Sequence, residues 1–320
     1  MLDVTAFGEL LIDFVPAPGS TPEEPLLKAM VGGAPGNFAA AAQAYGAHSA
    51  VIGKVGQDAF GDLILRRLGE LGMETRGVVR DGSAFTTLAF VTLSAAGERT
   101  FSFAREHGAD TRLAAEECDY SLIDEARLFH FGTLSLTHEP VRSATEAALK
   151  RARVQGKLVS CDPNLRLPLW NSPEEARARM LWALEQADIV KISDDEVQFL
   201  FGCGPEEGAE RILRDCGPRL VFVTQGAQGC CFASGAARGR TANPAVRPVD
   251  TTGAGDIFFG AAVSRLLRLG KPLEALTEGD LRGVTAFACA AAALSTQRYG
   301  GIASIPPEAE VLRLLAEEGT

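Results

Sequence analysis

The stretch DTTGAGDIFFG, residues 250–260, places one carboxylate, Asp256, between a glycine-rich turn and an apolar run. The turn predicts that a helix starts near Ala254, so the backbone N–H groups of Gly253, Ala254 and Gly255 become its unpaired first donors. These donors favour an anion such as a phosphoryl group, and Asp256 beside them can accept a proton from a hydroxyl that attacks the phosphorus. An acid in a first turn can also merely complement the helix dipole, and this stretch alone leaves both interpretations open.

A second glycine-rich stretch, VGGAPGNFAAAAQAYG, also precedes an expected helix. Gly32 and Gly33 would let a polar ligand approach the main chain, where Asn37 can both donate and accept hydrogen bonds. The glycines do not follow the G-x-G-x-x-G order of a dinucleotide fingerprint, and no ribose-binding acid comes after them. A glycine turn that only starts a helix is the alternative.

Three further polar segments each follow an expected strand, where an open α/β sheet places its ligands. They supply Asp162, Asn164 and Arg166 in SCDPNLRLPLW, Lys191, Ser193 and Glu196 in KISDDEVQFL, and Thr224, Gly226 and Gly229 in VTQGAQGC. Taken separately, the first two also fit a solvated loop and the third fits a hairpin turn. Together with the glycine-rich stretches they indicate phosphoryl transfer to a small hydroxyl compound.

Composition and missing motifs exclude several other classes of protein. The 320 residues are 46% hydrophobic and 22% charged, which is typical of a globular chain with one large core. The net charge of -10 argues against nucleic acid as a partner. The absence of a P-loop and of H-R-D and D-F-G motifs excludes P-loop NTPases and protein kinases.

The cysteines and the apolar segments bear on the compartment. The seven cysteines include no C-x-x-C pair, which fits neither a disulfide framework nor a zinc site. No basic leader is visible at the N-terminus, and the longest uncharged apolar stretch, GVTAFACAAAALSTQ, is shorter than the about 20 residues of a membrane span. We therefore expect a cytoplasmic protein that does not bind membranes.

Short apolar runs alternate with amphipathic stretches, which predicts an α/β fold with a mostly parallel central sheet and helices on both faces. The expected strands are VTAFGEL, SAVIGKV, ARLFHFG, KLVSCDP, ADIVKIS and RLVFVTQG, and the expected helices cover 38–45, 58–71, 139–153, 173–185, 206–214, 254–269 and 281–294. Residues 12–30 and 84–108 interrupt this rhythm, and alternation over 84–104 around the turn AAGE predicts two antiparallel strands. We expect these two segments to form a small β-sheet lid whose apolar face closes on a ligand or pairs with another chain.

Two long segments carry a family resemblance. GGAPGNFAAAAQAYGAHSAVIGKVGQDAFG and DTTGAGDIFFG resemble the two signatures of the ribokinase-like (PfkB) sugar kinases, and the resemblance covers residues 4–306. The segments LFHFGTLSL, CDPNLRLPLW and ADIVKISDDEVQFL are similar to fructokinases in particular. The resemblance implies a single ribokinase-like kinase domain over residues 1–320 that uses ATP to convert D-fructose to fructose 6-phosphate. A 2-keto-3-deoxygluconate kinase or a ribokinase of the same family is the alternative, and a non-catalytic sugar- or protein-binding homologue is a remote one.

The resemblance also implies roles for individual residues. Asp256 matches the general base of the family, and residues 253–255 match its anion hole. The sugar-binding positions are matched by Asp13, Gly32, Gly33, Asn37, Arg105, Asp110, Asn164 and Arg166. The nucleotide-binding positions are matched by Ser193, Thr224, Gly226, Gly229 and Cys289. Asparagine is common in the family at 193 and 289, so these two departures leave the nucleotide preference open.

Two cations and one protein partner follow from the same resemblance. Glu196 matches the acid that organises Mg²⁺ through water and phosphate, and Asp162 assists it. The positions of a monovalent cation site, expected to bind K⁺, are matched by Asp250, Thr252, Gly300 and Ser304. The lid of this family often pairs with its twin, which implies a homodimer through the lid.

Overall fold

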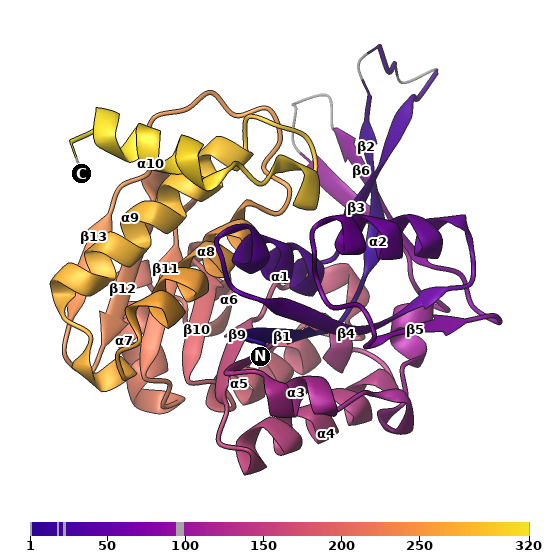
Figure 1. Ribbon diagram of the computed structural model, residues 1–320, viewed down its shortest axis with the longest axis horizontal. Coiled ribbons are helices and arrows are strands. Elements are labelled where there is room, and N and C mark those ends of the chain that lie inside the picture. Colours follow the sequence, from indigo (N-terminus) through magenta and orange to yellow (C-terminus); the bar gives the residue numbers. More distant parts are fainter. Residues whose placement is uncertain (1, 18, 22–23, 94–98, 320) are drawn as a thin grey trace.

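A nine-stranded sheet runs through the computed structural model, which describes residues 2–17, 19–21, 24–93 and 99–319 (Figure 1). The strand order is β13-β12-β11-β10-β9-β8-β1-β4-β5, and the strands from β11 to β5 in this order are parallel. At the other end of the order, β12 pairs antiparallel with β11, and β13 pairs antiparallel with β12. The bounds are β1 Val4–Phe7, β4 Ser49–Gly56, β5 Val78–Asp81, β8 Leu128–Gly132, β9 Leu158–Asp162, β10 Ile189–Ser193, β11 Leu220–Thr224, β12 Cys230–Ser234 and β13 Arg238–Thr241.

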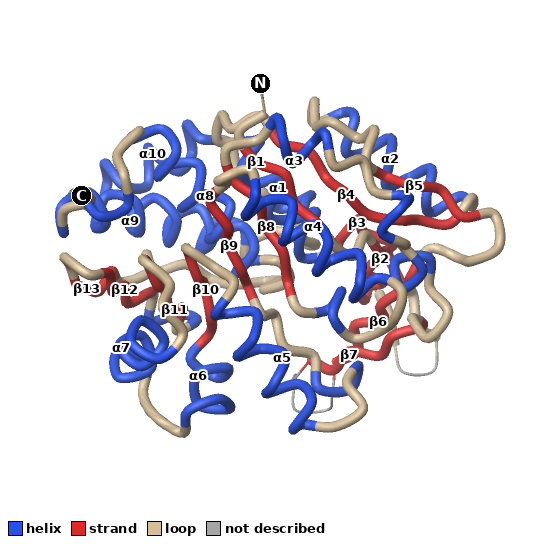
Figure 2. Tube along the Cα trace, turned by 90° about the horizontal axis from the view of Figure 1, so that it is seen from below, coloured by secondary structure: helices blue, strands red, loops and turns tan. Residues whose placement is uncertain are grey.

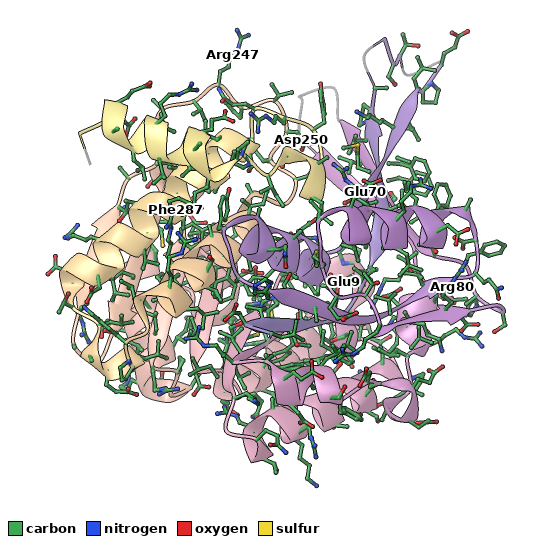
Figure 3. The ribbon with its side chains drawn as sticks, viewed as in Figure 1. Glu9, Glu70, Arg80, Arg247, Asp250 and Phe287 are labelled. Atoms are coloured by element: carbon green, nitrogen blue, oxygen red, sulfur yellow. The ribbon has the colours of Figure 1, made fainter. Side chains whose placement is uncertain are left out.

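Helices cover both faces of this sheet, and each face has its own hydrophobic core (Figure 2). One face packs against α1 Ala34–Ala44, α2 Ala59–Glu70, α8 Ala254–Leu269, α9 Glu278–Ser295 and α10 Glu308–Glu317. The other packs against α3 Ser121–Glu125, α4 Val141–Val154, α5 Pro173–Glu185, α6 Asp194–Phe201 and α7 Pro205–Asp215. Phe287 of α9 is buried in the first core, whereas Arg80 lies at the edge of the molecule (Figure 3).

A second, four-stranded sheet projects from this body in the order β3-β2-β6-β7 (Figure 1). Its strands are β2 Leu11–Pro16, β3 Leu27–Gly32, β6 Thr87–Leu93 and β7 Arg99–Ala104. The ring of Phe14 stacks on Phe90 and meets Phe60 of α2 edge to face, with ring centroids 5.3 and 5.6 Å apart. These contacts hold one face of the small sheet against α2, because aromatic pairs add to the burial of apolar surface.

The predicted α/β fold with a smaller sheet is confirmed, and the two predicted antiparallel strands over 84–104 are β6 and β7. The predicted turn AAGE lies outside the described residues. All six predicted strands and all seven predicted helices exist; α5 and α8 have the predicted bounds, and the other predicted elements have shifted ends. Helix α1 begins four residues before its predicted start because Pro35, which presets a helical φ, occupies its first turn. The sequence prediction missed β5, β12, β13, α3, α6 and α10.

None of the helices in the described ranges is long and apolar enough to cross a bilayer.

Candidate active site

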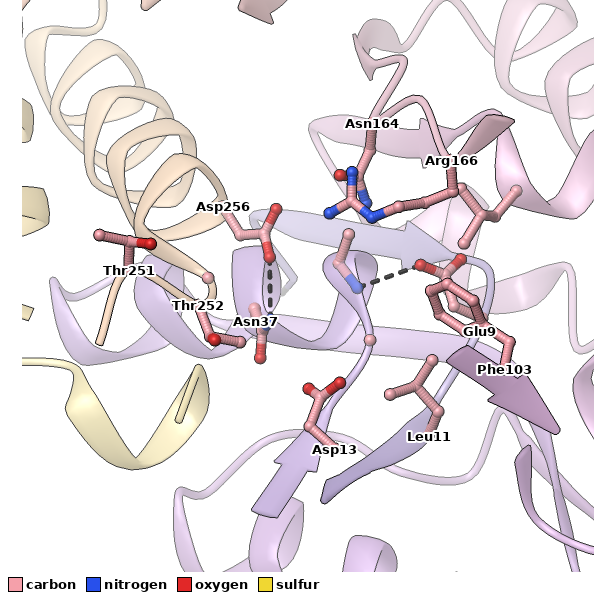
Figure 4. Close-up of a pocket in the computed structure, with 14 residues that line it drawn as sticks. Glu9, Leu11, Asp13, Asn37, Phe103, Asn164, Arg166, Thr251, Thr252 and Asp256 are labelled. Atoms are coloured by element: carbon pink, nitrogen blue, oxygen red, sulfur yellow. Dashed lines mark hydrogen bonds between the residues drawn. The ribbon is translucent and has the colours of Figure 1, made fainter. Parts of the chain in front are cut away.

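A cavity of about 380 Å³ lies where the two sheets meet the first turns of α1 and α8 (Figure 4). Its walls come from the small sheet, from the loop after β9 and from the starts of both helices, as expected for a ligand site beyond the carboxyl ends of parallel strands. The lining residues are Glu9, Leu11, Asp13, Gly33, Ala34, Asn37, Phe103, Leu134, Asn164, Arg166, Thr251, Thr252, Gly253 and Asp256. Segments more than 200 residues apart in sequence therefore share one wall.

Asp256 and Asn37 join the two helix starts. Asn37 Nδ2 donates a hydrogen bond of 2.8 Å to Asp256 Oδ2, while Asn37 Oδ1 is buried without a hydrogen-bond partner among the described residues. Burial raises the pKa of Asp256, and the Asn37 hydrogen bond and the charges of Lys191 and Arg166 oppose that rise. Of the three predicted anion-hole donors, the N–H of Ala254 already donates to the carbonyl of Thr251 at 3.3 Å.

A buried histidine beneath the cavity fixes how α1 and α8 lie. The ring of His130, in β8, stacks on Phe38 of α1 with centroids 3.7 Å apart and meets Phe259 of α8 edge to face at 5.5 Å. Burial lowers the pKa of His130 to about 3, so the imidazole is neutral and packs as an aromatic ring. Because Phe38 follows Asn37 and Phe259 lies one turn after Asp256, this packing positions both site residues.

Asp13 faces the cavity from β2 and depends on glycines for its place. A Cβ atom on Gly32 would lie 2.1 Å from Asp13 Oδ2, and Gly33 has a φ of 102° with the carbonyl oxygen of Glu9 2.4 Å from its Cβ position. No other residue type fits either position without a shift of its neighbours. Burial raises the pKa of Asp13 to about 7, with a further rise from the charge of Asp256 and opposition from Arg166.

Asn164 and Arg166 reach the cavity from the loop after β9. Asn164 has a φ of 49°, which turns the chain, and both side chains line the wall opposite Asp13 (Figure 4). The loop is tied to α6 because Glu196 Oε1 accepts a hydrogen bond of 2.6 Å from the N–H of Leu165. Glu196 Oε2 accepts from the N–H and the hydroxyl of Ser193, which caps α6. Glu196 therefore anchors the loop that carries part of the cavity wall.

Arg105 and Asp110 are not brought into the cavity. Both are buried, and Arg105 Nε donates to Asp110 Oδ2 at 2.7 Å. The rest of the guanidinium donates to Thr137 Oγ1 and to the carbonyl of Leu134, at 2.8 and 3.0 Å. This pair ties the end of the small sheet to the loop after β8, and in this conformation it supports the cavity from behind.

The sequence analysis missed Glu9, which lines the cavity between β1 and β2. Glu9 Oε1 accepts a hydrogen bond of 3.1 Å from the N–H of Ala34 at the start of α1. Burial raises the pKa of Glu9 to about 7, and the charge of Arg105 opposes the rise. The sequence contained a signal for it, because Glu9 interrupts the apolar run VTAFGELLIDFV. An acid in a buried segment is costly unless it has a partner or a function.

The five residues predicted to bind nucleotide lie outside the cavity lining. Ser193 and Thr224 end the neighbouring parallel strands β10 and β11 and are paired in register, so they share one edge of the sheet. Gly226 and Gly229 flank the turn that connects β11 to the antiparallel β12. This turn is the hairpin that the sequence analysis gave as an alternative interpretation of VTQGAQGC. Cys289 is buried within α9 and belongs to the hydrophobic core.

The predicted magnesium residues sit beside a buried lysine. Lys191 Nζ donates to Asp162 Oδ2 at 2.9 Å, and Asp162 Oδ1 is buried with no hydrogen-bond partner in the described ranges. Those ranges contain no group of three or more His, Cys, Asp or Glu side chains that could hold a metal ion. An orphaned carboxylate oxygen near the predicted anion hole suits Mg²⁺, which commonly keeps water and substrate phosphate as most of its ligands.

Two of the predicted potassium residues bond to the carboxylate of a third, Asp250. Asp250 Oδ2 accepts from the N–H of Gly300 and Asp250 Oδ1 accepts from the N–H of Thr252, both at 2.8 Å. Ser304 Oγ lies in the next turn and donates to the carbonyl of Gly301 at 2.8 Å. Asp250 is buried, and it draws the loop before α8 and residues 300–304 together. The oxygen-rich donor set fits a hard monovalent cation.

Comparisons with known proteins agree with this geometry. The family model described as pfkB family carbohydrate kinase matches residues 1–308. The chain is 43% identical to Fructokinase-1 of Zea mays over 316 residues, which cover 98% of this chain and 97% of that protein.

Two solved structures are similar over nearly the whole chain. A fructokinase with bound ATP from Xylella fastidiosa has a TM-score of 0.90 and 31% identity, covering 99% of both chains. A double-mutant fructokinase from Vibrio cholerae O395, in a form with fructose, ADP and potassium ion bound, has a TM-score of 0.87 and 30% identity, covering 98% of both chains. The sequence, fold and cavity together place this chain in the pfkB family of carbohydrate kinases.

Proposed function

We propose that this protein is a fructokinase that transfers the γ-phosphate of ATP to the 6-hydroxyl group of D-fructose. The observation that carries the proposal is the place of Asp256, at the start of α8, in a cavity that it shares with Asp13 and Asn37. A half-buried carboxylate beside the first N–H groups of a helix can take a proton from a hydroxyl while those groups bind an anion. The similarity to fructokinases supports the choice of fructose.

The reaction follows from the positions of these groups. Asp13 and Asn164 bind hydroxyl groups of the sugar, and Asp256 removes the proton of the attacking hydroxyl. Burial raises the pKa of Asp256, which makes its carboxylate a better proton acceptor than a carboxylate in water. Negative charge that develops on the phosphoryl oxygens meets the helix start at residues 253–255, where donors are preorganised.

Both cations are part of the proposal. Asp162 and Glu196 would hold Mg²⁺ through water and phosphate, and Mg²⁺ neutralises the charge of the ATP phosphates. Asp250, Thr252, Gly300 and Ser304 would hold K⁺ next to the helix start, where a cation strengthens the binding of an anion. Replacement of K⁺ by the bulky tetramethylammonium ion should lower kcat/KM for fructose, and an unchanged value would remove the K⁺ site from the proposal.

The small sheet would act as a lid in the same mechanism. It contributes Leu11, Asp13 and Phe103 to the cavity, so its closure would exclude water and limit ATP hydrolysis. Pairing of the lid with that of a second copy would give a homodimer, which sedimentation measurements test. A cytoplasmic location, where ATP is available, belongs to the proposal as well.

The nearest alternative is a 2-keto-3-deoxygluconate kinase, whose acidic substrate needs a cationic contact. Of the two arginines that could provide it, Arg105 is held by Asp110 outside the cavity, while Arg166 lines the cavity together with Glu9, Asp13 and Asp256. This excess of carboxyl groups supports a neutral sugar, because like charges in a confined site repel.

A panel of acceptors tests the proposal. D-Fructose, ribose, 2-keto-3-deoxygluconate and adenosine should be assayed with ATP, Mg²⁺ and K⁺, and the highest kcat/KM is expected for fructose. Faster turnover of the keto acid or of ribose would move the protein to another branch of the family. Phosphorylation of none of them would favour a binding protein.

A further inference from the structure

The ammonium group of Lys191 lies directly against the first turn of α8. Lys191 is the third residue of β10, and its side chain is buried. A Cβ atom on Gly255 would be 2.8 Å from Lys191 Nζ. The absence of a side chain at Gly255 therefore leaves room for the ammonium group next to the predicted anion hole. It also lets a ligand approach the main chain closely.

The hydrogen bonding of this lysine is incomplete. An ammonium group has three donors. In the part of the chain that the structure describes, Lys191 uses one of them, in the 2.9 Å bond to Asp162 Oδ2. The other oxygen of the same carboxylate, Asp162 Oδ1, is buried with no partner. Because buried polar groups are nearly always paired, two unused donors beside an unused acceptor indicate a polar ligand at this place.

The positive charge of Lys191 and the start of α8 both favour an anion at the same place. The ammonium group is held in place by its ion pair with Asp162 Oδ2, 2.9 Å away. The positive charge of Lys191 acts in turn on Asp256 across the helix start. A phosphoryl group at residues 253–255 would meet the backbone donors and this ammonium group together.

We propose that Lys191 is a further catalytic residue, whose ammonium group binds an oxygen of the transferring phosphoryl group, and that Asp162 positions it. The proposal rests on phosphoryl transfer at this site but not on the identity of the sugar. The sugar oxygen forms a bond to the γ-phosphorus, its proton passes to Asp256, and the bond from phosphorus to the bridging oxygen breaks so that ADP leaves with the electron pair. Lys191 keeps its own protons and meets the charge on the phosphoryl oxygens.

A comparison of AMP-PNP binding with ADP binding measures the contact of Lys191 with the γ-phosphoryl group. AMP-PNP has a γ-phosphoryl group and ADP does not, so the ratio of their dissociation constants, measured by titration calorimetry with Mg²⁺, reports on that group. In Lys191→Met we expect the affinity for AMP-PNP to fall about 10- to 100-fold while the affinity for ADP changes little, as for the loss of a charged hydrogen bond. Equal losses for both nucleotides, or no loss, would overturn the proposal.

Two further variants separate this contact from a structural effect. Lys191→Met combined with Asp162→Asn leaves no unpaired buried charge, and it should show the same loss of preference for AMP-PNP. Asp162→Asn alone keeps the ammonium group. In titrations of this variant and of Lys191→Met without Mg²⁺, where the proposed Mg²⁺ role of Asp162 does not enter, Asp162→Asn should retain most of the preference. A loss in Asp162→Asn as large as in Lys191→Met would show that only the integrity of the pair matters and would contradict a direct contact.

Lys54→Met serves as the matched control, because Lys54 is also buried and paired with carboxylates, whereas only Lys191 lies against Gly255 in the first turn of α8. It should leave both dissociation constants unchanged. The acceptor panel distinguishes the two failures. If fructose is phosphorylated and Lys191→Met binds AMP-PNP as the wild type does, only the role of Lys191 falls. If no acceptor is phosphorylated, the proposed function falls first.

Discussion

Two buried lysines of this chain have carboxylate partners, and their surroundings differ. Lys54 Nζ donates to both carboxylate oxygens of Glu117, at 2.7 and 2.8 Å, and to the carbonyl of Arg112 at 3.1 Å. Its neighbour Asp81 also accepts hydrogen bonds from Ser83, which contribute most to lowering the pKa of Asp81 to about 2. This cluster, formed by Lys54, Asp81 and Glu117, satisfies its charges internally.

The cluster at the cavity leaves hydrogen-bonding capacity unused. Lys191 makes one hydrogen bond in the described chain, and Asp162 Oδ1 and Asn37 Oδ1 are buried without partners there. Burial raises the pKa values of Asp13 and Asp256, whereas hydrogen bonds and ion pairs lower those of Asp81 and Glu117. The Lys54 cluster pairs its charges within the protein, while the cluster beside the cavity keeps unpaired polar atoms and raised carboxyl pKa values, a pattern typical of ligand sites.

The largest expected effect comes from Asp256→Asn, which removes the proton acceptor but keeps the shape of the side chain. We expect kcat for fructose to fall by about 10² to 10⁴, the range for loss of general-base catalysis. The thermal unfolding temperature should not fall, since the substitution removes a carboxylate that burial disfavours. Steady-state kinetics and a thermal melt measure both. Turnover close to that of the wild type would remove Asp256 from the role of base.

Asp13→Asn is expected to change both binding and stability. The loss of a charged hydrogen bond to the sugar should lower kcat/KM for fructose by about 10- to 100-fold. The pKa of Asp13 is about 7 in the folded protein, raised from 3.8. Between these two values the native state binds a proton that the unfolded state has lost, so the stability of the wild type falls as pH rises from about 4 to 7.

At pH 8 the free energy of unfolding of the variant should therefore exceed that of the wild type by about 1 to 4 kcal/mol. This difference should vanish below about pH 4. Urea unfolding at several pH values measures this. Asp81→Asn is the contrasting case, because the pKa of Asp81 is lowered to about 2. That variant should be less stable than the wild type at neutral pH, with the difference lost as pH falls through 2. If both substitutions changed stability in the same direction with the same pH dependence, the proposed difference between the two clusters would be wrong.

Lys54→Met should show the smallest effect on catalysis. Loss of the hydrogen bonds to Glu117 should cost about 1 to 3 kcal/mol of unfolding free energy, because a buried donor to a charged group is removed. The kinetic constants for fructose and ATP should stay as in the wild type. A drop of tenfold or more in kcat would place the Lys54 cluster in the catalytic machinery.

The sequence predicted the parts of the site that depend on local patterns. The glycine turn before Asp256 and the polar residues after β9 and β10 were recognised because helix starts and strand ends follow from short-range spacing. Contacts between distant segments were not accessible in the same way. Neither the pairing of Arg105 with Asp110 behind the cavity wall nor the packing of His130 between two helices has a local signature.

A crystal structure with fructose and AMP-PNP–Mg²⁺ tests the central claim most directly. The account predicts that the 6-hydroxyl oxygen of fructose lies about 2.6–3.2 Å from an Asp256 carboxylate oxygen, in line with the γ-phosphorus bound at residues 253–255. A sugar bound away from Asp256, or an Asp256 side chain turned from the γ-phosphate in that complex, would contradict it.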